Sequence, residues 1–265
     1  MSSKPAHDRN PRELEGTNAL VTGAGGDIGR AISLELASLG ARVVVVGRDR
    51  ERLAATRDAV TRAGGAVEAI TADITEPLGA LERALGSTDV LVNNAAAFAP
   101  YGLLEEIAET DVVRVHETIV LAPMRLCAAV LPGMKERRFG RIVNVGSIAA
   151  ALGAERQVAY TSAKSALYGL TKSVALEGAR FGVTCNLIDL GFFLTERVSR
   201  TIPTEIQRAI VAATPLKRAG SVDEAAAAVA FLASRRASFV TGAVVPVTGG
   251  LELGLFPRAD PPPNA

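Results

Sequence analysis

Two residues able to exchange a proton, Tyr160 and Lys164, lie four positions apart, and Ser147 precedes the tyrosine by thirteen residues. On a helix, a spacing of four places the phenol and the ammonium on one face, about one turn apart. A free tyrosine titrates at about 10, and a nearby lysine cation favours the phenolate, so we expect Lys164 to lower the pKa of Tyr160. Ser147 could hold a substrate oxygen beside the phenol. These residues predict a proton donor directed at a carbonyl group, which is reductase chemistry if a hydride source lies beside it.

A glycine-rich turn near the start of the chain indicates where a hydride-carrying nucleotide would bind. Residues 18–21 are an apolar strand candidate, residues 22–29 read Thr-Gly-Ala-Gly-Gly-Asp-Ile-Gly, and residues 30–39 carry apolar side chains at helical spacing. Such a turn points free backbone N–H groups and the positive end of a helix at a pyrophosphate. Glycine turns are common, so the motif carries weight only because alternating strands and helices follow it.

Strand-like and helix-like segments alternate along the chain. The strand candidates are residues 18–21, 42–46, 66–71, 89–92, 141–145, 184–188 and 243–247, and the helix candidates are 29–39, 50–63, 78–85, 109–137, 159–180, 204–213 and 222–233. Runs such as the valines at 43–46 are apolar on both faces, as in parallel strands covered by helices. The pattern predicts an α/β fold, a single doubly wound Rossmann-type domain with a mostly parallel seven-stranded sheet and helices on both faces.

Residues able to do chemistry follow the predicted strands. Six of them come one or two residues after a strand candidate: Gly23, Arg48, Asp73, Asn93, Ser147 and Asp189. Because the carboxyl ends of parallel strands meet at one edge of a sheet, we expect one ligand site there. Residues 17–254 are the expected domain, between a disordered lead-in at 1–16 and a flexible tail at 255–265.

The composition limits the class of protein. The 265 residues are 48% apolar and 22% charged, with a net charge of +1, and the basic residues are scattered, which argues against a nucleic-acid partner. His7 and His116 cannot assemble a metal site, and we expect His116 to be structural. Cys127 and Cys185 predict buried free thiols of a reducing compartment. The polar N-terminus lacks a signal-peptide core and no uninterrupted apolar run approaches ~18 residues, so we expect a cytoplasmic protein with no membrane partner.

Together these residues resemble the short-chain dehydrogenase/reductase family over about residues 16–250. The features that occur in the family's order and approximate spacing are the glycine turn, Asp73, Asn93-Asn94-Ala95, Ser147, Tyr160, Lys164, and Gly191 followed by Thr195. The resemblance implies that Tyr160 is the general acid or base, that Ser147 orients the carbonyl or alcohol, and that Lys164 contacts the nicotinamide ribose. It also implies a small-molecule substrate and a homotetramer or homodimer, which many members build through the helices expected here at 109–137 and 159–180.

The same resemblance assigns a cofactor site. It implies that Asp73 and Ile74 flank the adenine, that Asn94 lies near the cofactor, and that Ile188 lies near the nicotinamide amide. The full set of expected cofactor-binding residues, with no metal site beside it, is Gly23, Asp27, Ile28, Gly29, Arg48, Asp73, Ile74, Asn94, Ala95, Tyr160, Lys164, Ile188 and Thr195.

The residues after the second strand bear on the choice of cofactor. An acid there suits the ribose 2′-hydroxyl of NAD, and an arginine suits the 2′-phosphate of NADP. The chain reads Gly47-Arg48-Asp49, with glycine at the expected acidic position, which favours NADP(H) over NAD(H). A one-residue shift of the alignment would instead offer the Asp49 carboxylate.

Two substitutions depart from the family pattern within the expected machinery. Asp27 stands where the turn usually has a glycine; its carboxylate could repel a pyrophosphate, or it could point to solvent or cap the following helix, which we favour. Ile119 falls where the family has an asparagine that holds a water linking the lysine to solvent. Because isoleucine cannot hydrogen-bond, we expect an interrupted or rerouted relay and slower turnover, by less than the ~10²–10⁴-fold of general acid–base catalysis.

Further departures follow the sixth strand. Leu190-Gly191 replaces the usual Pro-Gly, and Asp189 precedes it where a small residue is common. Asp189 could reach substrate or be a solvated loop acid, and we favour the latter. Residues 192–215 are the expected lid, whose apolar side chains suggest an apolar or cyclic substrate.

The predicted function is the reduction of a ketone, or the oxidation of a secondary alcohol, by an NADP(H)-dependent oxidoreductase. Two alternatives remain open. The residues Asp27, Ile119 and Leu190 would suit a protein of this fold that binds a nucleotide without turnover. A preserved Tyr160 would also suit non-redox acid–base chemistry, such as a dehydration or a cyclisation. Consumption of the cofactor distinguishes the first function from the other two.

Overall fold

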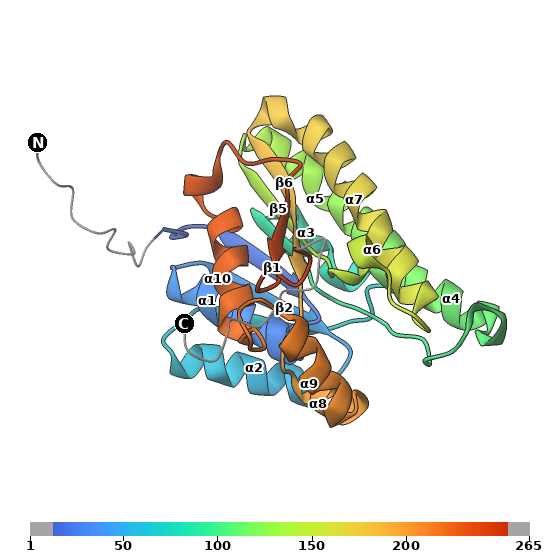
Figure 1. Cartoon of the computed structure of the whole chain (residues 1–265). Coiled ribbons are helices and arrows are strands. Elements are labelled where there is room, and N and C mark those ends of the chain that lie inside the picture. Colours follow the sequence, from blue (N-terminus) through green and yellow to red (C-terminus); the bar gives the residue numbers. More distant parts are fainter. Residues whose placement is uncertain (1–12, 254–265) are drawn as a thin grey trace, which may run out of the picture.

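One parallel β-sheet forms the centre of the molecule in the computed structural model, which describes residues 13–253 (Figure 1). The strands are β1 (Asn18–Thr22), β2 (Arg42–Gly47), β3 (Val67–Thr71), β4 (Val90–Asn93), β5 (Gly140–Val145), β6 (Val183–Leu190) and β7 (Val244–Val247). They lie in the order β3-β2-β1-β4-β5-β6-β7, and every neighbouring pair is parallel. The predicted seven-stranded, doubly wound α/β sheet is confirmed, and within the described residues it is wholly parallel.

Helices cover both faces of this sheet (Figure 1). One face packs against α1 (Asp27–Ser38), α2 (Arg50–Arg62) and α10 (Val222–Ala233), and the other against α4 (Glu109–His116), α5 (Ala122–Glu136) and α7 (Val158–Gly178). The shorter helices are α3 (Glu82–Gly86), α6 (Ala149–Leu152), α8 (Glu196–Thr201) and α9 (Thr204–Ala213), and 3₁₀ turns lie at Leu78–Leu81, Leu104–Glu106, Ala179–Phe181 and Arg235–Ala237.

Each strand buries alternate residues on opposite faces of the sheet. In β2, Val43 and Val45 face the side of α1 and α10, whereas Val44 and Val46 face the side of α5 and α7. All four side chains are at most 7% exposed, which explains why this strand reads as an uninterrupted apolar run. The same alternation decides toward which helix layer a polar side chain at a strand end points.

The strand order creates a crevice at the carboxyl ends of β1 and β4. From β1 the chain continues to β2 and β3 on one side, and then crosses to β4 on the other. Ligands of open α/β sheets bind where the strand order reverses in this way. The glycine turn after β1 and the segment after β4 border this crevice.

Helix boundaries differ from the prediction where the backbone changes its hydrogen-bonding pattern. The helix predicted over residues 109–137 is a continuous run of α4, a π-helical turn at Glu117–Leu121, and α5. The sequence does not predict α6 and α8, because four or six residues are too short to show an apolar period. The run Glu109–Glu136 is long and apolar enough to cross a membrane, but 56% of its most apolar window is buried inside the protein, as in a core helix.

Most of the expected lead-in and the whole expected tail lie outside the described residues. Residues 13–16, which the sequence pattern places in the lead-in, form a turn instead. Leu14 is fully buried, and its backbone N–H donates to Leu39 O at 2.8 Å. The ordered chain therefore begins before residue 17.

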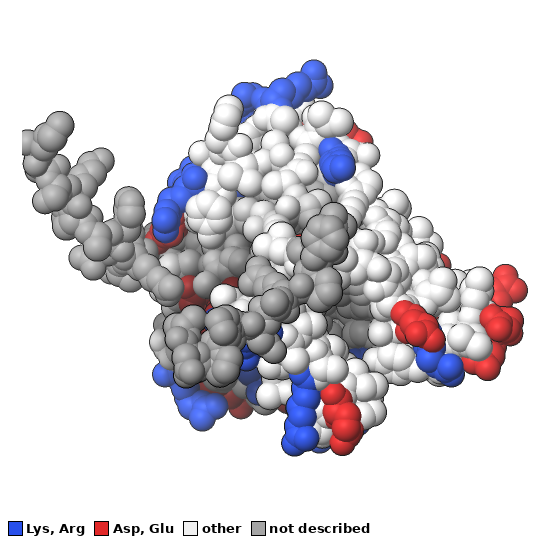
Figure 2. Space-filling view, in the orientation of Figure 1, with Lys and Arg blue, Asp and Glu red and all other residues white. Residues whose placement is uncertain are grey.

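Charged side chains are dispersed over the face of the molecule that Figure 2 shows. Lys and Arg lie at separate points of its rim, some of them beside Asp or Glu, and the surface over α7 carries few charges. Among the described residues on this face, basic side chains do not gather into one patch. The even distribution agrees with the net charge of +1.

Candidate active site

The segment after β4 braces the glycine turn between β1 and α1. The Asn94 side chain donates to Thr22 O at 2.9 Å and to Gly23 O at 3.2 Å. The Thr22 hydroxyl accepts from the backbone N–H groups of Asn94 and Ala95 at 3.0 and 3.1 Å. The first turn of α1, whose N–H groups lack intrahelical partners, is thereby held against a cleft.

Two glycines let the backbone close up around this cleft. Gly23 has φ +64°, and a Cβ there would lie 2.8 Å from Ala95 Cα; a Cβ on Gly29 would lie 2.8 Å from Ala24 Cα. A Cβ on Gly26, in contrast, would meet nothing closer than 3.6 Å. The helix start is therefore packed tightly on its inner side and open on its outer side, which fits a pyrophosphate at a helix N-terminus.

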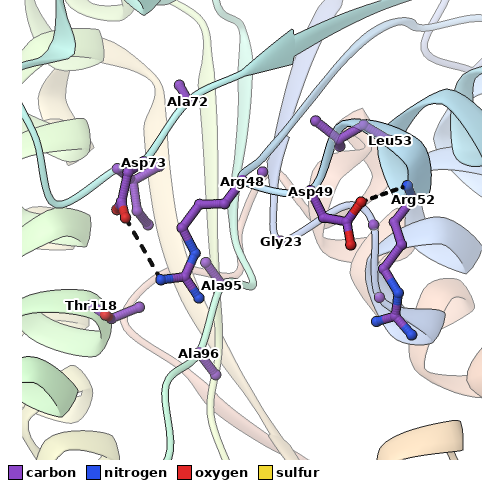
Figure 3. A pocket seen from close by; sticks show the side chains of 14 residues that line it. Gly23, Arg48, Asp49, Arg52, Leu53, Ala72, Asp73, Ala95, Ala96 and Thr118 are labelled. Atoms are coloured by element: carbon purple, nitrogen blue, oxygen red, sulfur yellow. Dashed lines mark hydrogen bonds and ion pairs between the residues drawn. The ribbon is translucent and has the colours of Figure 1, made fainter. Parts of the chain in front are cut away.

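Arg48 and Asp73 border the cleft after β2 and β3 (Figure 3). Arg48 Nη1 lies 3.6 Å from Asp73 Oδ2, and the arginine side chain is 70% exposed, so the guanidinium can leave this ion pair for a ligand. Asp73 also accepts from the Thr75 N–H at 2.9 Å and from its hydroxyl at 2.7 Å. Burial acts to raise the pKa of Asp73, but Thr75 and Arg48 outweigh burial and hold the pKa below its ordinary value.

Asp49 is committed to the start of α2. Its carboxylate accepts from the backbone N–H groups of Glu51 and Arg52, each at 3.0 Å, and so caps the helix (Figure 3). Because Gly47 has no side chain and Asp49 is engaged as a cap, the Arg48 cation is the charge that this strand end can offer to a ligand. This arrangement suits a phosphate better than a ribose hydroxyl.

The loop after β5 and helix α7 bring Ser147, Tyr160 and Lys164 together around a cavity of about 340 Å³. The Ser147 hydroxyl hydrogen-bonds to Tyr160. The Lys164 ammonium, whose residue is 3% exposed, donates to Val145 O at 2.6 Å. Its Nζ lies 5.7 Å from the centre of the Tyr160 ring, one turn away along α7. The three side chains can therefore act on one ligand.

The pKa values at this site differ from the expectation. Burial raises the pKa of Tyr160, against the Ser147 hydrogen bond and the positive charge of Arg197, which lower it. Burial of the lysine lowers the pKa of Lys164 to about 8. The pKa of Tyr160 is therefore raised rather than lowered as expected, because burial penalises its charged form.

Aromatic residues and one arginine complete the wall of the cavity. The Phe98 ring stacks on Tyr160 with ring centres 4.8 Å apart, and the Arg197 guanidinium lies 3.2 Å from the centre of the Phe98 ring. Among the described residues, Lys164 and Arg197 are the only charged side chains that line the cavity, and most of the others are apolar. An apolar or aromatic ligand without a positive charge fits this lining.

Asp27 links the glycine turn to the segment that covers the cavity. Its carboxylate accepts from the Glu196 N–H at 2.7 Å, at the start of α8. The Glu196 side chain in turn pairs with Arg52 of α2 and with Arg200. The N-cap of α1 is Gly26, so the interpretation that Asp27 caps its own helix is wrong. The carboxylate is instead directed to a backbone donor 169 residues away.

Three predicted positions lie deeper than the sequence suggests. Ile188 is fully buried in the core and does not line the cavity, which Leu190 and Gly191 border instead. Ile119 is 1% exposed and belongs to the core under the sheet. Asp189 is 2% exposed, so the interpretation as a solvated loop acid is wrong.

The sequence analysis does not identify Phe98, Tyr101, Tyr168 or Arg197, of which all but Tyr168 line the cavity. Tyr168 continues the spacing of four from Tyr160 and Lys164 along α7, so the same helical rule could have found it. Arg197 has no comparable signal, because it lies in a six-residue helix without an apolar period.

Comparison with known proteins identifies the family. Residues 23–252 match a family model described as Enoyl-(Acyl carrier protein) reductase. Over 246 residues the chain is 37% identical to 3-oxoacyl-[acyl-carrier-protein] reductase FabG from Pseudomonas aeruginosa. The aligned region covers 90% of this chain and 98% of the relative. The chain belongs to the short-chain dehydrogenase/reductase family.

Other relatives of this family are of similar length. The chain is 34% identical over 241 residues to (2S)-[(R)-hydroxy(phenyl)methyl]succinyl-CoA dehydrogenase subunit BbsC from Thauera aromatica, covering 89% of this chain and 94% of the relative. A structure of 3-oxoacyl (acyl-carrier-protein) reductase from Agrobacterium tumefaciens with NADP bound aligns with a TM-score of 0.85 and 29% identity, over 91% of this chain and 96% of that one. As a member of the short-chain dehydrogenase/reductase family, the chain is an oxidoreductase.

Proposed function

We propose that this protein is an NADP(H)-dependent oxidoreductase that reduces a ketone, or oxidises a secondary alcohol, on a small and largely apolar substrate. The observation that carries the proposal is the meeting of Ser147, Tyr160 and Lys164 at one cavity, beside the cleft of the glycine turn. NADPH bound along this cleft would supply a hydride to the carbonyl carbon, and in alcohol oxidation NADP⁺ would accept the hydride.

Residues from several strand ends hold the cofactor in this proposal. The glycine turn with the first N–H groups of α1 would receive the pyrophosphate, and Arg48 would bind the 2′-phosphate. Asp73 and Ile74 would border the adenine, and Lys164 would bind the nicotinamide ribose. The exposed Arg48 cation, the absence of a side chain at Gly47 and the NADP-bound structure of the Agrobacterium relative support the choice of NADP(H).

Tyr160 is the proton donor for reduction. Its raised pKa keeps the phenol protonated at neutral pH, so its hydroxyl can give a proton to the carbonyl oxygen as the carbon accepts the hydride. Ser147 already hydrogen-bonds to this phenol and can hold the substrate oxygen beside it. In the oxidative direction the same phenol must be deprotonated, so alcohol oxidation requires a higher pH than ketone reduction.

The lining of the cavity restricts the substrate. Its only charged side chains among the described residues are the cations Lys164 and Arg197, so a cationic substrate would meet like charges while neutral or anionic ketones would not. Residues 192–215 form the proposed lid, and their helix α8 is tied to the glycine turn through Asp27 and Glu196. Opening that link would admit the substrate and release the product.

Assembly and location are further parts of the proposal. Several exposed apolar side chains lie on α4, the π-helical turn after it, α5 and α7, namely Val113, Leu121, Met124 and Leu176. A homotetramer or homodimer built through these helices would bury them. Light scattering coupled to size exclusion tests this, and a monomeric mass would refute it. The buried free thiols Cys127 and Cys185 support a reducing compartment such as the cytoplasm.

The reaction is tested by the oxidation of NADPH in the presence of neutral aryl and alkyl ketones, measured at the nicotinamide absorbance band. We expect wild-type turnover and a loss of about 10²- to 10⁴-fold in Tyr160→Phe, with the Kd for NADPH unchanged. Binding of NADPH without oxidation on any ketone would refute a reductase. A Tyr160→Phe variant that retains full activity would refute the role of the phenol.

A further inference from the structure

A buried carboxylate lies under α7 at the end of β6. Asp189 is 2% exposed. It lies two residues after Leu187 and four after Cys185, so it shares their face of β6, which is the face toward α7. Its Oδ2 accepts a hydrogen bond from the Tyr168 hydroxyl. Its Oδ1 has no hydrogen-bond partner among the described residues. A carboxylate buried in this way needs a compensating charge or donor nearby.

Two of the residues assigned to catalysis flank the backbone beside this carboxylate. Lys164 donates to Val145 O at 2.6 Å, and Ser147 follows Gly146, which lies against Oδ1. The Asp189 charge raises the pKa of Lys164, against the larger effect of burial. Burial raises the pKa of Asp189, and the Tyr168 hydroxyl, the Ser147 backbone and the Lys164 charge act to lower it. Asp189 therefore touches both the loop that carries the serine and the helix that carries the lysine.

The surroundings leave little freedom to this carboxylate. Tyr168 follows Lys164 by one turn of α7, so the two side chains approach Asp189 from one helix face. Gly146 lies beside Oδ1, and a Cβ at that position would collide with it. The charge of Glu252, from the segment after β7, acts to raise the pKa of Asp189, and the Glu252 carboxylate accepts from the Thr248 hydroxyl.

We propose that Asp189, fixed by the Tyr168 hydroxyl, is a positioning residue that keeps Lys164 protonated and holds the Ser147 loop in place. The proposal rests on the proposed function, in which Lys164 acts as an ammonium on the cofactor ribose. It accounts for a carboxylate at a position where a solvated loop acid is the simpler expectation, and for a tyrosine four residues after the lysine. Asp189 supplies a negative charge that favours an ammonium in this desolvated pocket.

The sign of the pH effect follows from these contacts. Without the Asp189 charge, the pKa of Lys164 falls below its value of about 8, because burial is then unopposed. Reduction that needs the ammonium must then decline at a lower pH than in the wild type. In unfolding, a lysine with a lowered pKa in the folded state makes stability rise with pH from that pKa up to about 10.4, the ordinary lysine value. This rise must also begin at a lower pH when Asp189 is neutralised.

The test compares the wild type with Asp189→Asn and Tyr168→Phe. Asp189→Asn keeps the shape and an acceptor for Tyr168 but removes the charge, and Tyr168→Phe removes only the hydroxyl. Asp89→Asn is the matched control, because Asp89 is a buried carboxylate paired with Arg137 at 2.9 Å. It directly precedes β4, so it lies at the amino ends of the strands, away from the site at their carboxyl ends. For each protein the pH profile of kcat/KM for ketone reduction, the Kd for NADPH and the pH dependence of the unfolding midpoint are measured.

In Asp189→Asn we expect the alkaline limb of the kcat/KM profile to move to lower pH by about one unit, and the rise of the unfolding midpoint to move with it. Tyr168→Phe should move both in the same direction by less. The unfolding curve of Lys164→Met, which lacks the titrating lysine, identifies the rise that belongs to this group. Asp89→Asn should lower the midpoint at all pH values without moving either feature.

The possible results separate the two proposals. An alkaline limb and an unfolding rise that stay at the wild-type pH in Asp189→Asn would overturn the role of Asp189. A wild-type protein that reduces no ketone, but whose unfolding rise still shifts in Asp189→Asn, would refute the proposed reaction while supporting the pairing of Asp189 with Lys164. A shift in Asp89→Asn as large as that in Asp189→Asn would overturn the assignment, because the effect would then be general.

Discussion

Replacement of Arg48 by alanine tests the choice of cofactor. The Arg48 side chain is 70% exposed, and its ion pair with Asp73, at 3.6 Å, contributes at most about 1 kcal/mol in such an exposed setting. A charge-assisted hydrogen bond from the freed guanidinium to a 2′-phosphate is worth about 1.5–3 kcal/mol. The difference leaves a net gain of about 1–2 kcal/mol on binding NADPH. Arg48→Ala should therefore raise the Kd for NADPH by about 5- to 30-fold.

Titration followed by nicotinamide fluorescence measures this change for both nucleotides. NADH lacks the 2′-phosphate, so its Kd should change by less than about 2-fold in Arg48→Ala. Arg57→Ala is the matched control, because Arg57 lies on α2, the helix that follows Arg48, pairs with Asp58 and does not line the cleft. Equal weakening of NADPH and NADH, or an unchanged Kd for NADPH, would refute the reasoning. Tighter NADH than NADPH binding by the wild type would refute it as well.

Three further predictions concern the interior of the site. Ile119→Asn should lower the free energy of unfolding by about 3 kcal/mol without raising kcat, because the amide would lie unpaired in an apolar core. Denaturant unfolding measures the stability and steady-state kinetics measure kcat. A variant that is faster and equally stable would contradict the prediction. Gly146→Ala should cost about 1–3 kcal/mol of stability, since its Cβ would lie 2.6 Å from Leu187 Cδ2 and against Asp189; an unchanged thermal midpoint would contradict this. A ketone with an ammonium group should show at least a ~10-fold lower kcat/KM than its neutral isostere, because Lys164 and Arg197 repel it, and equal values would contradict that.

Local patterns predicted most of the fold. The valine run of β2 and the regular alternation of segments predicted a parallel sheet, because strands covered on both faces are apolar throughout. The last two long helices, α9 and α10, begin and end where the apolar spacing predicts. Short elements such as α6 and α8 escaped prediction, because a single helical turn does not repeat often enough to show a period.

The candidate site was predictable where one rule of geometry connects its residues. Tyr160 and Lys164 share a helix face by their spacing, and Ser147 follows a strand whose end meets the same edge of the sheet. The pKa values were not predictable in this way. Burial depends on every element packed around a group, and here it outweighs the lysine–tyrosine pairing that the spacing suggested.

The sequence by itself determined the α/β architecture, the glycine turn and the serine, tyrosine and lysine of the site, because each depends on neighbours within a few residues or on the common edge of parallel strands. Only the tertiary structure decided what the acidic residues do. Asp27 meets the Glu196 N–H across 169 residues of chain, and Asp189 meets the Tyr168 hydroxyl across 21. A carboxylate takes its role from the donors and charges that folding brings to it, and these partners leave no periodic trace in the sequence.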